Sequence, residues 1–345
     1  MSATRHLDQP AAAPALGGEP LLRVRGLRVS FATRDGHVRA VRGLDYHIGP
    51  GEALGLVGES GCGKSVSALA LLGLLPRPAG RISGGSATFR GLDLLAIGPR
   101  QMRDVRGNRI AMIFQDPLSS LNPVMPIGRQ VSEAVQRHMG GGRREALRRA
   151  AQLLTMVGIP DAERRLDDYP HRLSGGMRQR VMIAMALSCE PDLLIADEPT
   201  TALDVTIQAQ ILDLLRRLRE ELGMALLLIT HDLGVVAGVT DRLAVMYAGR
   251  IVETGPTEQV LGAPRHPYTL GLLRSLPRLD RPRGVPLVPI EGSPPDLATV
   301  IVGCPFRPRC AYAIERCAED PPLIPVDEVQ ASACWVRPSE TAVPT

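Results

Sequence analysis

Apolar and polar side chains alternate in two segments near the N-terminus, residues 21–31 and 38–48, which predicts a pair of half-buried antiparallel strands. Asp35-Gly36 lies between them and is a hairpin turn signal. Other segments are continuously apolar, as in parallel strands that a sheet buries on both faces. These predicted buried strands are residues 52–57, 193–197 and 225–229, with further strands predicted at 86–90, at 109–114 and, as a last edge strand, at 250–255.

A helical period predicts the elements between these strands. An apolar helical run covers residues 66–75, and an arginine-rich helical pattern at 127–166 indicates an inserted helical subdomain that extends to about residue 190. A further amphipathic helix is predicted to end at Gly223. Its apolar positions are Ile211, Leu214, Leu215, Leu218 and Leu222.

Composition divides the chain into three parts. Residues 1–20 are rich in Ala and Pro and predict a disordered tail, residues 21–276 hold the elements above, and residues 277–345 are dense in proline and contain four of the cysteines. We therefore expect a main domain and a small C-terminal Cys-rich extension. No apolar run approaches the roughly eighteen residues that span a bilayer, and the N-terminus does not read as a signal peptide, so we expect a cytoplasmic protein.

Charge and aromatic content argue against a nucleic-acid partner. The net charge is +4, the arginines are dispersed, and aromatic residues make up only 3% of the chain. Proteins that bind nucleic acids concentrate basic residues and use aromatic platforms to stack bases. In the cytoplasm the six cysteines are expected to be thiols or metal ligands rather than disulfides.

Lys64 is the only lysine among forty basic residues, and it lies in a segment that fits G-x-x-x-x-G-K-[ST]. In such a phosphate-binding loop (P-loop), a compact ammonium reaches phosphates through a ring of backbone N–H groups, where the wide fork of arginine would not serve. The strand before it and the helix after it supply the geometry that a phosphate needs. The sequence thus predicts a P-loop NTPase core. The loop residues are Gly58, Glu59, Ser60, Gly61, Cys62, Gly63, Lys64 and Ser65.

Two further motifs carry possible chemistry. Asp197 ends a buried strand, where it can hold Mg²⁺ together with the Ser65 hydroxyl, and Glu198 follows it and can orient or deprotonate an attacking water. Ser174-Gly175-Gly176 opens an apolar-faced helix and predicts a second anion-binding helix N-terminus. Ser-Gly-Gly alone would usually be a loop.

In this order and at these separations, the motifs of residues 21–280 resemble the ABC transporter ATPase family. The resemblance implies two ATPase subunits stacked head to tail, with ATP between the P-loop of one and the Ser174-Gly175-Gly176 signature of the other. It implies Walker A, Walker B and catalytic roles for residues 58–65, Asp197 and Glu198. It also implies that Gln115 senses Mg²⁺ and contacts the membrane partner, that Asp204 belongs to the D-loop and that His231 is the switch histidine. Phe31 is implied to stack on adenine, and a role in the hydrophobic core is the competing interpretation.

Three segments are similar to the oligopeptide and dipeptide importer ATPases, whose relatives also handle nickel or glutathione. They are residues 114–123, 266–269 and 303–310. The resemblance implies ATP hydrolysis that drives peptide import, at the cytoplasmic face of the membrane. The implied partners are a second ATPase subunit, identical or related, two transmembrane permeases and an extracellular solute-binding protein. The alternatives are a soluble ABC ATPase of DNA repair or ribosomes, and a binding module that does not hydrolyse ATP.

Four cysteines cluster in the C-terminal extension. They are Cys304, Cys310, Cys317 and Cys334, with five, six and sixteen residues between them. Four thiolates favour a tetrahedral metal or cluster site, but this spacing matches neither the common zinc fingers nor the usual ferredoxins, so zinc and iron–sulfur stay open. The family resemblance implies a [4Fe–4S] cluster, with structural Zn²⁺ as the alternative. Cys62 and Cys189 are expected to have no metal-binding role.

Overall fold

The computed structural model describes residues 19–34, 36–201, 203–276 and 289–336. The predicted N-terminal tail lies outside these residues except for its last two positions. The start of the predicted C-terminal extension, residues 277–288, and its last residues, 337–345, also lie outside.

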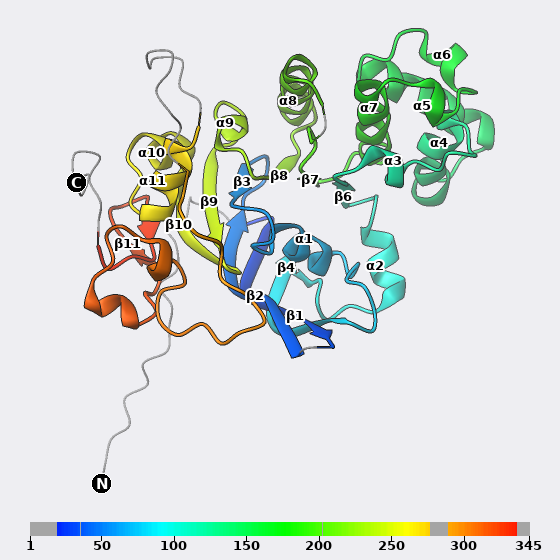
Figure 1. Ribbon diagram of the computed structural model, residues 1–345. Coiled ribbons are helices and arrows are strands. Elements are labelled where there is room, and N and C mark those ends of the chain that lie inside the picture. The colour runs from blue at the N-terminus through cyan, green and yellow to red at the C-terminus, as the bar shows by residue number, and fades with distance from the viewer. Residues whose placement is uncertain (1–18, 35, 202, 277–288, 337–345) are drawn as a thin grey trace.

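Two β-sheets form the centre of the fold (Figure 1). The smaller sheet is antiparallel, with the order β2-β1-β4-β5, and consists of β1 (Leu22–Thr33), β2 (Gly36–Ile48), β4 (Gly80–Phe89) and β5 (Leu92–Asp93). The larger sheet has the order β11-β12-β10-β9-β3-β8-β7-β6. Its strands are β3 (Ala53–Val57), β6 (Ile110–Ile113), β7 (Leu193–Asp197), β8 (Ala225–Thr230), β9 (Arg242–Tyr247), β10 (Arg250–Pro256), β11 (Ile324–Pro325) and β12 (Ala331–Ser332). The predicted hairpin and the predicted buried strands are confirmed.

Helices flank the larger sheet and also gather in a separate group formed by α3 to α7 (Figure 1). The helices are α1 (Lys64–Leu71), α2 (Pro99–Val105), α3 (Pro117–Ser120), α4 (Ile127–His138), α5 (Arg143–Met156), α6 (Ala162–Arg165), α7 (Gly175–Ala186), α8 (Val205–Leu222), α9 (Leu233–Val236), α10 (Thr257–Gly262) and α11 (Pro267–Arg274). Short 3-10 helices cover Pro170–Arg172, Arg307–Arg309 and Glu315–Ala318. The predicted helix at 66–75 is displaced. It begins two residues earlier, because the P-loop turns directly into it, and it ends before Gly73, whose φ of 60° cannot continue a helix.

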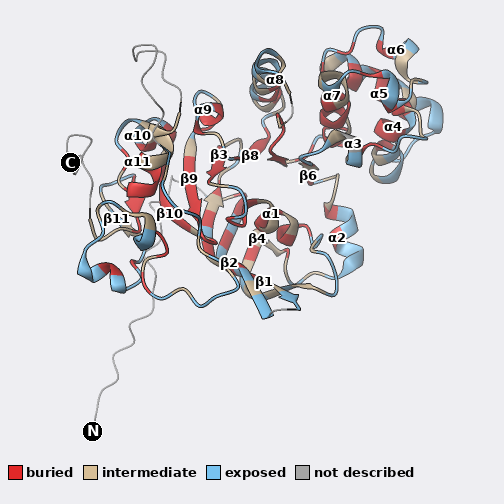
Figure 2. Cartoon of the chain, in the orientation of Figure 1, coloured by how far each residue is buried: buried red, intermediate tan, exposed pale blue. Residues whose placement is uncertain are grey.

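The larger sheet is buried on both faces, and alternate residues of each strand enter different cores. In β3, Leu54 and Leu56 pack with the antiparallel sheet and α1, whereas Ala53 and Val57 pack with the helices of the opposite face. Figure 2 shows the buried residues concentrated on these strands and on the inner sides of the helices. Double burial explains the continuous apolar runs in the sequence. In the part of the chain that the structure describes, no helix is long and apolar enough to cross a membrane.

The predicted edge strand at 250–255 is not an edge. β10 pairs with β9 on one side and with β12 of the C-terminal extension on the other, where Glu253 lies opposite Ser332. The Glu253 side chain is fully buried and accepts hydrogen bonds from the backbone N–H groups of Arg265 (2.5 Å) and His266 (3.0 Å) and from the Gln330 amide (2.7 Å). Sheet pairing and a buried polar contact therefore join the extension to the sheet.

We predict a pH-dependent contribution of Glu253 to stability. Burial raises its pKa from 4.5 to about 6. Because the folded pKa is raised, this contribution is fully present below pH 4.5 and is lost as the pH rises through 6, a loss of about 1 kcal/mol between pH 5 and pH 7. Denaturant unfolding of the wild type and of Glu253→Gln, which cannot titrate, should show the wild type losing about that much relative to the variant. A gap that does not change with pH would contradict the prediction.

Candidate nucleotide-binding and hydrolysis site

The predicted P-loop joins β3 to α1, and two of its glycines are required by close packing. Gly63 has a φ of 102°, and a Cβ there would lie 2.2 Å from the Ala40 carbonyl oxygen. A Cβ on Gly58 would lie 2.1 Å from the Met246 carbonyl oxygen. Side chains at either position would push the loop off the β2 and β9 backbones, so the glycines let the loop lie close against both sheets.

The ammonium of Lys64 lies inside this loop. Its side chain is buried, and Nζ donates to the carbonyl oxygens of Gly58 (2.6 Å) and Glu59 (3.1 Å). A buried cation within a ring of backbone groups at a helix N-terminus attracts an anion, and its shape suits a phosphate chain.

Ser65 and Asp197 meet beside the loop. The Ser65 hydroxyl donates to Asp197 Oδ1 at 2.8 Å, which joins the start of α1 to the end of β7. Burial raises the pKa of Asp197, and the Glu198 carboxylate raises it further, while the Ser65 hydrogen bond and Lys64 lower it. A hydroxyl and a carboxylate are oxygen ligands of the kind that Mg²⁺ binds, so this pair fits the metal of a nucleotide complex.

Three side chains converge on the Glu198 carboxylate. Gln115 Nε2 and Thr201 Oγ1 each donate to Oε2 at 2.9 Å, and His231 Nδ1 lies 3.2 Å from Oε1. The backbone of Glu198 is left-handed, with a φ of 47°, and its N–H donates to Ile229 of β8. A non-glycine residue in this region is strained, which is typical of functional sites. Thr201 has no motif of its own, and its only signal in the sequence is its position three residues after Glu198.

The predicted signature lies apart from the P-loop within one chain. Ser174 caps α7, its Oγ accepting from the N–H of Met177 at 3.3 Å, and Asp204 caps α8 by accepting from the N–H of Ile207 at 2.9 Å. A Cβ on Gly176 would lie 2.8 Å from Ile207 Cγ2, so the glycine lets α7 approach α8. Among the described residues no hydrogen bond joins the signature to the P-loop, and α7 belongs to the group of helices set away from α1 in Figure 1. Gly175 and Ser174 are exposed.

Phe31 is half-buried near the end of β1, an interior strand of the antiparallel sheet, between Val38 of β2 and Gly80 of β4. It packs against the core, and a Cβ on Gly80 would lie 3.0 Å from its ring. A partly exposed ring is compatible with stacking on a base, and its packing is equally that of a core residue, so the adenine-stacking role stays a prediction.

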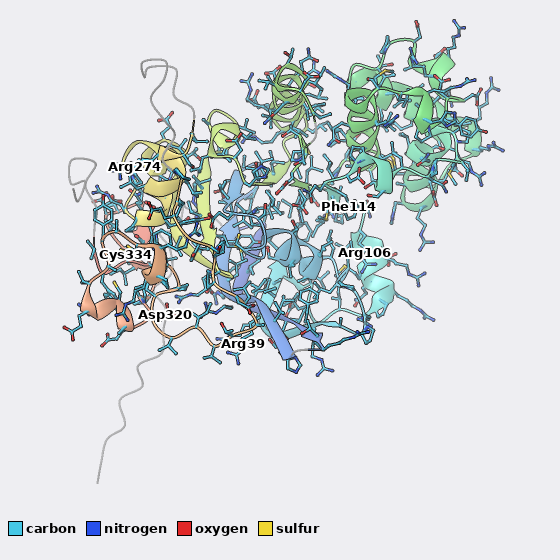
Figure 3. All side chains as sticks on the ribbon, in the orientation of Figure 1. Arg39, Arg106, Phe114, Arg274, Asp320 and Cys334 are labelled. Carbon is cyan, nitrogen blue, oxygen red and sulfur yellow. The ribbon has the colours of Figure 1, made fainter. Side chains whose placement is uncertain are left out.

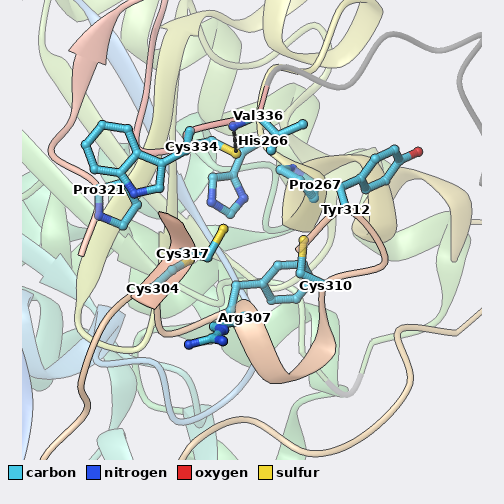
Figure 4. A pocket seen from close by; sticks show the side chains of 12 residues that line it. His266, Pro267, Cys304, Arg307, Cys310, Tyr312, Cys317, Pro321, Cys334 and Val336 are labelled. Carbon is cyan, nitrogen blue, oxygen red and sulfur yellow. Dashed lines mark hydrogen bonds between the residues drawn. The ribbon is translucent and has the colours of Figure 1, made fainter. Parts of the chain in front are cut away.

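The four cysteines of the C-terminal extension line one pocket, together with Phe306 (Figure 4). Burial raises the pKa of Cys310 to about 11 and that of Cys334 to about 12, and neighbouring cysteines contribute to both shifts. The described residues include no group of three or more His, Cys, Asp or Glu side chains arranged around a single metal ion. The thiols thus surround a common space without converging on one point.

Comparison with known proteins gives these features a family. Residues 41–201 match the family described as "ABC transporter", and residues 252–317 match "Oligopeptide/dipeptide transporter, C-terminal region". A putative peptide import ATP-binding protein of Brucella ovis is 54% identical over 327 residues, which cover 92% of this chain and 97% of the relative. The chain belongs to the ABC transporter ATPase family.

Other relatives of this ABC ATPase carry related names. The oligopeptide transport ATP-binding protein OppD of Salmonella typhimurium is 52% identical, over 91% of this chain and 93% of its own length. The dipeptide transport ATP-binding protein DppD of Bacillus subtilis is 51% identical, over 92% of this chain and 95% of its own. Among solved structures, the dimeric cassette MJ0796 bound to ADP and Pi is 25% identical with a TM-score of 0.61, over 68% of this chain and 98% of that one. The expected cassette fold and ATPase family are confirmed.

The convergence on Glu198 generates a prediction. We expect Glu198→Gln to keep ATP binding and to lower kcat by roughly two to four orders of magnitude, because the amide preserves the packing and removes the carboxylate that is predicted to orient water. Turnover is measured as phosphate release, and ATP binding is measured by titration calorimetry. Thr201→Val is the matched comparison, because it removes one hydrogen bond to the carboxylate and leaves the charge. Near-normal turnover of Glu198→Gln would contradict the assignment.

Proposed function

We propose that this chain is the ATP-hydrolysing subunit of a membrane importer of dipeptides and oligopeptides. The convergence of Gln115, Thr201 and His231 on Glu198, beside the Ser65–Asp197 pair, supports hydrolysis. The match of residues 252–317 to the oligopeptide/dipeptide transporter C-terminal region carries the choice of peptide import.

In the proposed reaction, the P-loop and Lys64 bind the phosphates of ATP. Ser65 and Asp197 would hold Mg²⁺, which would neutralise charge at the phosphates when bound. Glu198 orients a water for in-line attack on the γ-phosphorus and receives its proton as the bond between that phosphorus and the ADP oxygen breaks, and Gln115, Thr201 and His231 hold the carboxylate in place. Glu198 is largely buried at the strand end, which limits its contact with bulk water.

The exposed signature supports a head-to-tail dimer. Ser174 and Gly175 are exposed at the N-terminus of α7, where backbone N–H groups can bind an anion. Val205 is 83% exposed beside Asp204, as a surface that a second subunit covers would be. A second copy or a related ATPase would bring its own signature to the P-loop of this chain, and the similar ATP-binding cassette MJ0796 has a dimeric structure.

Two permeases and an extracellular solute-binding protein complete the proposed importer, with this chain on the cytoplasmic face of the membrane. Phe114, labelled in Figure 3, is 40% exposed next to Gln115, and Val124 is 81% exposed on the loop that follows α3. Exposed apolar side chains beside the Gln115 segment suit a contact with a membrane subunit. Import of nickel or glutathione by the same ATPase is the alternative, since the substrate is chosen by the partner chains.

The test is transport by the assembled complex. We expect vesicles that contain this chain, its permeases and internal Mg²⁺-ATP to accumulate a labelled dipeptide or oligopeptide that is presented with the binding protein. The same vesicles with Glu198→Gln should accumulate none. Mass spectrometry of the ligand held by the purified binding protein separates the alternatives. A bound peptide would support peptide import, whereas bound nickel or glutathione would support the alternative function.

The four cysteines are proposed to hold a [4Fe–4S] cluster. A zinc ion with Zn–S bonds of about 2.3 Å needs four sulfur atoms about 3.8 Å apart, converging on one point. A cubane cluster needs four thiols spread around a larger common space. The four thiols line one pocket, and the residues that would hold the cluster are Cys304, Cys310, Cys317 and Cys334. Bound, the cluster would cross-link these segments of the extension.

Protein purified without oxygen should therefore be brown and contain about four irons and four acid-labile sulfides per chain. Cys304→Ser should lower the iron content, while Cys189→Ser, which changes a cysteine outside the pocket, should leave it unchanged. A colourless preparation that contains one zinc per chain would establish the zinc alternative.

A further inference from the structure

Arg309 links the C-terminal extension directly to the P-loop. Its guanidinium forms a bidentate ion pair with the Glu59 carboxylate, Nη1 to Oε2 at 2.7 Å and Nη2 to Oε1 at 2.9 Å. The side chain of Arg309 is only 4% exposed, and that of Glu59 is 26% exposed. We propose that Arg309 is a positioning residue for ATP binding, which holds the second residue of the P-loop in place and cancels its charge. The proposal rests on the assignment of residues 58–65 to the ATP phosphates.

Glu59 is anchored from outside the loop at two points. Arg309 holds its carboxylate, and the hydroxyl of Tyr268 on α11 accepts a hydrogen bond from its backbone N–H at 2.8 Å. The Glu59 carbonyl oxygen in turn accepts from Lys64 Nζ at 3.1 Å and from the N–H of Cys62 at 3.3 Å. A displacement of Glu59 would therefore also displace Lys64, the residue assigned to the phosphates.

Arg309 is itself held firmly. Besides Glu59, it donates to the Tyr247 hydroxyl (3.3 Å) and to the carbonyl oxygens of Glu291 (3.0 Å) and Ile290 (3.3 Å). These bonds and the two to Glu59 occupy all five N–H donors of a guanidinium. Lysine has neither the fork nor enough donors to replace this network.

The Arg309 ion pair also has an electrostatic role. Without Arg309, the Glu59 carboxylate would be a partly buried anion next to the site of a polyanionic triphosphate, and charges in a partly desolvated site interact strongly. Arg309 follows Phe306 in the turn between Cys304 and Cys310, two cysteines of the pocket. The turn between these two cysteines thus positions the cation that neutralises the Glu59 carboxylate of the P-loop.

The test is a double-mutant cycle on full-length protein, with Arg309→Met, Glu59→Gln and the double variant. We expect Arg309→Met to weaken Mg²⁺-ATP binding about ten-fold, measured by calorimetry, because it leaves a charge unpaired. In hydrolysis assays KM should rise by a similar factor and kcat should change less than about two-fold, because Arg309 contacts none of the groups around Glu198. Adding Glu59→Gln should restore the affinity to within about three-fold of wild type, because it removes the uncovered charge.

Two controls make the outcome decisive. Asp320→Asn breaks the ion pair between Asp320 and Arg250, which also ties the extension to the sheet. This ion pair contacts no P-loop residue, so the ATP affinity of Asp320→Asn should equal that of the wild type. Asp320 and Cys334 both lie in the extension (Figure 3). Lys64→Ala tests the site itself and should abolish ATP binding. If Lys64→Ala still binds ATP, the site assignment fails, whatever the cycle shows.

If Lys64→Ala loses binding and the double variant is as weak as Arg309→Met, the inference about Arg309 alone is overturned. A wild-type affinity of Arg309→Met would overturn it as well. Should Arg309→Met not fold, as judged by circular dichroism, the same cycle is run with Arg309→Gln and the same criteria apply.

Discussion

Burial of the parallel sheet on both faces is the constraint on which the site depends. A charged side chain inside β3, β8, β7 or β6 would be desolvated, because both faces of these strands lie in a core, and Asp197 occurs only as the last residue of β7. The four strands are parallel neighbours, so their carboxyl ends meet at one edge. The P-loop, His231, Glu198 and Gln115 follow these ends in that order. Chemistry far apart in the sequence is thereby brought together.

Local patterns were enough to predict the P-loop, Asp197 and Glu198 at this edge. Apolar runs that end in a glycine loop or an acid mark a strand and its first functional residue, and both are local features. The resemblance to a known family then ordered Gln115, Glu198 and His231 into one site, which their mutual contacts support. Thr201 escaped because a threonine near a strand end has no distinguishing pattern.

Contacts made by the C-terminal extension could not be predicted in the same way. β12 is two residues long, so no periodicity marks it, yet its pairing converts β10 from an edge strand into an interior one. Arg309 and Glu59 are separated by 250 positions, and arginine is so frequent in this chain that one more carried no signal. The amphipathic helix before Gly223 shows the contrast, because its buried positions Ile211, Leu214, Leu215 and Leu218 were all visible in a local period. Leu222, at the end of that helix, is only partly buried.

The balance of charge around the P-loop connects these observations. Glu59, Asp197 and Glu198 bring three carboxyl groups to a site that must accept a polyanion, and Lys64 alone cannot offset them. Arg309 neutralises the first, and a divalent cation beside Ser65 would offset the second, which in the chain alone shares its hydrogen bond with a neutral hydroxyl. Among the described residues the Glu198 carboxylate is held by Gln115, Thr201 and His231, none of which is an arginine or a lysine. This arrangement suits the proposed role of Glu198 as a base, because a fixed cation beside a carboxylate favours its charged form over its protonated form. Arg309 is thus paired with the P-loop carboxylate that takes no part in the proposed chemistry, whereas the ion pair of Glu198 among the described residues is with His231.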